Sequence, residues 1–74
     1  MNRYEQEIKG IDQKQVEHAQ AIQDLYALEE KEDRGLDADE RLKVEEHTKA
    51  IRVLDEAKAE AEANLRTIHD AQDV

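Results

Sequence analysis

The chain has 74 residues, of which 42% are charged and 38% are apolar, and it contains no Phe, Trp, Pro or Cys. So short a chain, with so few aromatic residues, is expected to fill a narrow seam between helices rather than a three-dimensional core. The lack of Cys excludes a disulfide framework and thiolate metal sites. Twenty acidic residues against eleven Lys and Arg give a net charge of −9, which argues against binding to a phosphate backbone.

The first predicted element is an amphipathic helix over about residues 2–33. Its seam residues alternate between spacings of four and three, which is a heptad pattern. They are Tyr4, Ile8, Ile11, Gln15, His18, Ile22 and Leu25, and Leu28 extends the row toward the turn. Gln15 and His18 place a polar band in the middle of this seam, which we expect to fix register or partner choice.

A turn is predicted at residues 34–37. Gly35 is expected to close the first helix in the left-handed conformation that glycine tolerates. Asp37 and Glu40 have the spacing of a capping box, in which each residue accepts a hydrogen bond from the backbone of the other. A helix end and a helix start this close together favour a tight hairpin, and the competing interpretation is one continuous rod through Gly35.

The second predicted helix covers about residues 38–72. Its seam residues are Val44, His47, Ile51, Leu54, Ala57, Ala61, Leu65 and Ile68. We therefore predict an all-α fold, with residues 1–74 forming one two-helix antiparallel coiled-coil hairpin. Folding about Gly35 pairs residues whose numbers sum to roughly 72, so that His47 faces Leu25 and His18 faces Leu54. A two-helix seam buries little apolar surface, so we expect the hairpin to self-associate.

Two apolar residues lie off the second seam. Leu42 and Val53 are eleven residues apart and nearly in line on a helix. They are candidates for a second, self-associating stripe, although single exposed apolar residues are also common on protein surfaces.

No constellation of residues points to catalysis or to a metal. In the predicted register, His18 and His47 lie about 10 Å apart along the helix axis, and neither follows a Glu at three residues. Asp37 and Glu40 are explained by capping and do not have EF-hand spacing. With neither Ser nor Cys in the chain, nucleophilic catalysis by these residues is excluded. We expect no enzyme activity, no cofactor and no small-molecule substrate.

The start of the second helix carries a longer pattern: a Gly-Leu pair, a capping residue, an acid pair and seam residues at fixed offsets. These positions are Gly35, Leu36, Asp37, Asp39, Glu40, Val44, His47, Ile51 and Leu54. Over residues 36–55 the pattern resembles the N-terminal delta, or scaffolding, domain of tailed-bacteriophage major capsid proteins. Val44 stands where that family often has Phe, and His47 where it often has Leu, so these two positions depart from it.

The resemblance implies a non-catalytic scaffolding module that guides procapsid assembly through coiled-coil contacts with capsid subunits. It implies a location inside the phage procapsid, in the cytoplasm of the host cell. The expected partners are proteins, with no nucleic acid and no membrane, since no run of about twenty apolar residues occurs. The polar N-terminal residues also argue against a secretion signal. The alternative function is an acidic coiled-coil adaptor that regulates a protein partner.

Overall fold

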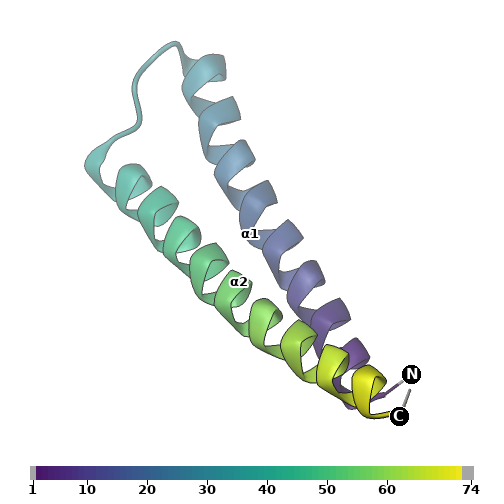
Figure 1. Cartoon of the computed structure of the whole chain (residues 1–74). Helices are drawn as coiled ribbons and strands as arrows, with labels where there is room; N and C mark the ends of the chain where they lie inside the picture. Colours follow the sequence, from purple (N-terminus) through teal and green to yellow (C-terminus); the bar gives the residue numbers. More distant parts are fainter. Residues whose placement is uncertain (1, 73–74) are drawn as a thin grey trace.

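The computed structural model describes residues 2–72, which form two α-helices joined by a short loop (Figure 1). Helix α1 is Arg3–Glu32, with 30 residues, and helix α2 is Ala38–Gln72, with 35 residues. The two helices run antiparallel and pack against each other, in a rod of 60 × 17 × 13 Å. The fold is the all-α hairpin that the heptad pattern predicts, and the continuous rod is wrong.

Helix α1 begins with a capping box and ends on a left-handed residue that is not glycine. Asn2 Oδ1 accepts from the Glu5 backbone N–H at 2.9 Å, and Glu5 Oε1 accepts from the Asn2 N–H at 3.4 Å. At the other end Asp33 has φ 50° and ψ 49°, and no glycine of residues 2–72 has a positive φ. The prediction that Gly35 closes this helix is therefore wrong. Asp adopts the left-handed conformation more readily than most side chains, and it ends the helix two residues earlier.

Helix α2 begins with the predicted capping box. The Asp37 N–H donates to Glu40 Oε1 at 3.0 Å, and the Glu40 N–H donates to Asp37 Oδ1 at 2.8 Å. Both bonds satisfy backbone or side-chain groups that the helix itself leaves without partners.

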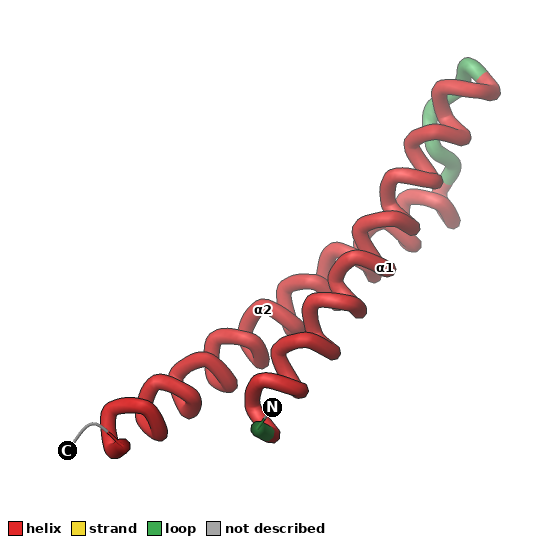
Figure 2. The backbone as a smooth tube through the Cα atoms, turned by 90° about the vertical axis from the view of Figure 1, so that its right-hand side faces the viewer, coloured by secondary structure: helices red, strands yellow, loops and turns green. Residues whose placement is uncertain are grey.

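The loop runs back beside the end of α1 before α2 starts. The Leu36 N–H donates to Glu29 Oε2 at 3.2 Å, which brings the loop level with a residue seven positions earlier in the chain. Helix α2 therefore starts beside the last turns of α1 and not beyond its end. As a result, each α2 residue contacts α1 residues nearer to the N-terminus than a turn centred on Gly35 predicts. At the far end of the hairpin, α2 extends past the start of α1 (Figure 2).

The shifted register changes the predicted partners. His18, predicted to face Leu54, contacts His47 instead. Gln15, predicted to face Ala57, donates to the backbone oxygen of Ile51. The predicted pairings are therefore wrong at these positions.

Little of the seam is fully covered. Of the predicted seam residues, Ile11 and Ala61 are buried, Leu28 is 36% exposed, and all the others are half-buried. The loop residue Leu36 and the capping residue Glu40 are also buried, although sequence periodicity did not place either in the seam. Two helices cannot surround a side chain on all sides, so large residues in the seam keep part of their surface in water.

Candidate functional site

The centre of the seam holds a pair of histidines, one from each helix. His18 Nδ1 and His47 Nδ1 lie 2.8 Å apart, and the ring centroids are 5.1 Å apart with the planes inclined at 51°. The expected separation of about 10 Å is wrong because the loop shifts the register. A hydrogen bond between two Nδ1 atoms requires one ring to donate and the other to accept. The pair is thus a specific polar contact, which lies next to Gln15 in a row of mostly apolar residues.

Polar contacts also close one edge of the seam, next to the histidines. Gln15 Nε2 donates to the Ile51 backbone oxygen at 3.3 Å and also to a carboxylate oxygen of Asp55. About one helical turn away from Gln15 and Asp55, Lys58 Nζ lies 2.7 Å from Asp12 Oδ1. Its hydrogen bond to this carboxylate raises the pKa of Lys58. We call this side the polar edge, defined by Asp12, Gln15, Asp55 and Lys58. Sequence analysis identified Gln15 but missed the other three, because their role depends on the register.

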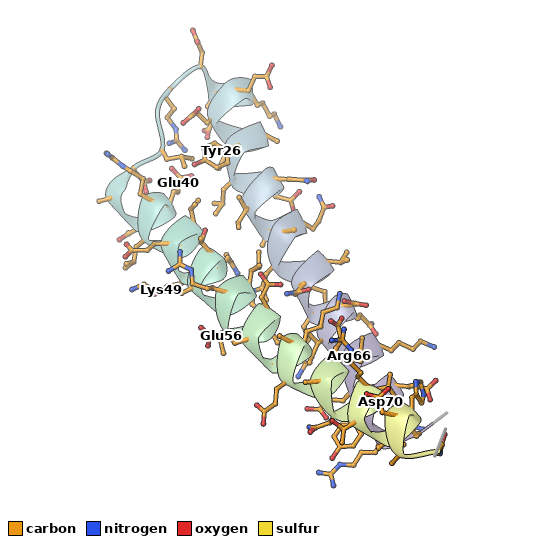
Figure 3. The ribbon with its side chains drawn as sticks, in the orientation of Figure 1. Tyr26, Glu40, Lys49, Glu56, Arg66 and Asp70 are labelled. Carbon is orange, nitrogen blue, oxygen red and sulfur yellow. The ribbon has the colours of Figure 1, made fainter. Side chains whose placement is uncertain are left out.

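A second polar network holds the loop end of the hairpin. Arg34 Nη1 donates to Glu40 Oε1 at 2.7 Å, and Arg34 Nη2 donates to Glu32 Oε2 at 2.8 Å. Arg34 also donates to the Gly35 backbone oxygen at 3.0 Å, so one guanidinium joins both helix ends to the loop. Figure 3 shows Glu40 at this end of the molecule, near Tyr26 of α1.

The charges in this network stabilise each other. The hydrogen bonds from Arg34, and then the one from the Asp37 backbone, lower the pKa of Glu40 to about 2. The same contacts to Glu40 and Glu32 raise the pKa of Arg34. Glu40 is thus a buried, ionised carboxylate with two partners, which is a structural role. Arg34 was missed by sequence analysis, and its only signal was a basic residue in a short loop flanked by acids.

The other edge of the seam is open, and it is largely apolar near the loop end of the hairpin. A hollow of about 390 Å³ is lined there by Ala21, Asp24, Leu25, Leu28, Lys43 and His47. Further along the same edge, a second hollow is mostly polar, with Arg3, Glu7, Glu60 and Asn64 lining it beside Tyr4, Ala57 and Ala61. Residues 43, 47, 50, 57 and 61 recur at helical spacings of three, four and seven, so they share one side of α2. We call the part of this side near the loop end the groove edge, defined by Ala21, Asp24, Leu28, Lys43 and Ala50.

The off-seam apolar residues are exposed. Leu42 is 53% exposed and Val53 is 63% exposed, and neither lines either hollow of the groove edge. Val16, at 67% exposed, lines a hollow with Asp12 and Asp55 on the polar edge. Leu42 and Val53 thus lie on the outer surface of α2, and their role in self-association stays a prediction.

The described residues of the hairpin offer contact surfaces along both edges of the seam. Among residues 2–72, no three His, Asp or Glu side chains converge as metal ligands would, and neither helix has an apolar stretch that could cross a bilayer. Comparison with known protein families, with curated proteins and with solved structures found no match to this chain.

Proposed function

We propose that this chain is a non-catalytic assembly module that gathers protein subunits through helix–helix contacts, as the resemblance to the phage capsid delta domain implies. The observation that carries the proposal is the small amount of burial in a long hairpin. Only Ile11, Leu36, Glu40 and Ala61 are buried among the described residues, in a rod 60 Å long. Such a hairpin is expected to be marginally stable alone, and contact with another helical surface adds the missing burial.

The charge of the chain supports a role that does not involve binding to nucleic acid. A net charge of −9 disfavours contact with a phosphate backbone. This fits a scaffolding module that lines the inside of a procapsid and contacts capsid subunits before DNA enters. The sequence that follows residue 74 in the gene tests this part of the proposal: continuation into a capsid shell protein supports it, and an unrelated continuation contradicts it.

The alternative function, an acidic adaptor that regulates a protein partner, is favoured by one feature at the loop end. Tyr26, 49% exposed, lines an open hollow of about 660 Å³ together with Glu29, Glu30 and Asp33. Arg34 lines it as well, but its charge is paired with Glu32 and Glu40. An exposed aromatic ring among carboxylates suits a partner with basic and apolar side chains. Binding through this hollow should weaken when Tyr26 is replaced by Ala, whereas assembly through the helix edges should not.

The assembly function can be tested with a fusion. The chain is joined to the N-terminus of a monomeric fluorescent protein, and the sedimentation of the fluorescent species is followed over a range of concentrations. We expect the fusion to sediment as a multiple of its own mass, in a fraction that rises with concentration, while the fluorescent protein alone stays monomeric. A fusion that keeps its helical signal and stays monomeric throughout contradicts the proposal.

A further inference from the structure

The two edges of the seam differ in how far contacts within the hairpin occupy their side chains. On the polar edge, Gln15 and Lys58 reach across to the opposite helix and bond to its oxygens. On the groove edge, Leu28 is 36% exposed and lines the 390 Å³ hollow with Ala21, and Ala50 lies on the same side of α2. Small side chains leave room for another helix to approach closely, and the exposed Leu28 has apolar surface to bury.

The groove edge also carries one charge of each sign. Asp24 of α1 and Lys43 of α2 line the same 390 Å³ hollow from opposite walls. A basic peptide would meet Lys43 unfavourably, and an acidic one would meet Asp24. A surface that bears both charges side by side is complementary to itself when a two-fold axis exchanges them.

The exposed area of the chain indicates how large a partner the hairpin accommodates. The accessible surface is 5814 Å² for a mass of 8.6 kDa. A compact monomer of this mass exposes about 4700 Å², so the hairpin exposes about 1100 Å² more. A standard protein interface covers about 800 Å² on each partner. The excess is therefore of the size that one further copy of the chain would cover.

We propose that a second copy of this chain docks on the groove edge, with a two-fold axis parallel to the long axis of the hairpin. This inference rests on the proposed assembly function and specifies its surface and its geometry. Rotation about that axis places α1 of one copy antiparallel to α2 of the other, at the same height. Leu28 of each copy then enters the hollow of the other copy, and Asp24 of each copy faces Lys43 of the other. The product is a four-helix bundle with both loops at one end.

Sedimentation equilibrium of the isolated chain and its variants tests this surface. The wild type is expected as a dimer in equilibrium with monomer. Leu28→Glu and Ala50→Glu place a charge in the contact and should raise the dimer Kd at least about ten-fold. Val16→Glu is the matched control, because Val16 is 67% exposed on the polar edge, and it should change the Kd less than about two-fold. Circular dichroism verifies that each variant keeps its helices.

A charge exchange tests the two-fold pairing separately. Asp24→Lys alone and Lys43→Asp alone should each weaken the dimer, and the double variant should restore it toward the wild-type Kd. A dimer that tolerates both groove substitutions, or one weakened equally by Val16→Glu, overturns the proposed surface and leaves the assembly function standing. An oligomer larger than a dimer overturns the two-fold geometry. A chain that is monomeric at every concentration overturns this inference and the assembly function together.

Discussion

The histidine pair at mid-seam leads to a prediction about the coupling between two side chains across the seam. A double-mutant cycle with His18→Ala, His47→Ala and the double variant isolates the coupling between the rings. The two Nδ1 atoms lie 2.8 Å apart and share one proton in a hydrogen bond. A net protein hydrogen bond contributes about 1 kcal/mol, and we expect a favourable coupling of that size.

Each single variant leaves the other imidazole in the half-buried seam without its partner, so each should destabilise the hairpin. The double variant should cost about 1 kcal/mol less than the sum of the two single variants.

Thermal unfolding followed by circular dichroism measures the cycle at one fixed pH and one fixed protein concentration. For a chain of this length, 1 kcal/mol shifts the Tm by about 4–8 °C, which is easily resolved. A coupling near zero, or an unfavourable one, refutes this account of the pair.

Three further predictions concern the loop and the seam. Gly35→Ala should stabilise the hairpin by about 0.4–1 kcal/mol in urea unfolding, because an added Cβ meets nothing within 4 Å. Asp33→Val should cost about 1–2 kcal/mol in the same assay, because residue 33 is left-handed. A stabilising Asp33→Val together with a destabilising Gly35→Ala would contradict the assignment of the helix end. The pKa of Glu40 is about 2 in the fold and 4.5 ordinarily, so its stabilising effect is complete above pH 4.5 and disappears as pH falls toward 2. The free energy of unfolding of the wild type should fall across this pH window, and that of Glu40→Gln should lack this part of the fall. Ile11→Ala should cost about 2–4 kcal/mol in the same urea assay, against less than about 0.5 kcal/mol for exposed Val16→Ala, and equal costs would contradict the seam.

The helices and their seam faces could be predicted from the sequence because local rules determine them. Heptad spacing depends only on the geometry of a helix, so Ile11 and Ala61 are found where the pattern places them. The capping box of Asp37 and Glu40 is equally local, since its two residues are three apart and both bonds form within one turn.

The register could not be predicted in the same way. It depends on the path of the loop, and that path is set by a left-handed Asp33 and by the bond from the Leu36 N–H to Glu29. Gly35 is the residue with the strongest preference for the left-handed conformation, but preference alone does not determine which loop residue adopts it. The histidine contact, the polar edge and the groove edge all depend on this register, so they emerge only from the structure.

The unequal lengths of the helices give the hairpin a direction of opening. At the loop end Arg34 joins Glu32, Gly35 and Glu40, whereas the last turns of α2 project beyond α1 without a neighbouring helix (Figure 2). Fraying should therefore begin at the projecting end of α2 and advance toward the loop end. Amide hydrogen exchange should be fastest in the final turns of α2 and slowest near the histidines. The two helices should therefore separate while the loop end still holds them together, and a protein that separates them would begin at the projecting end of α2.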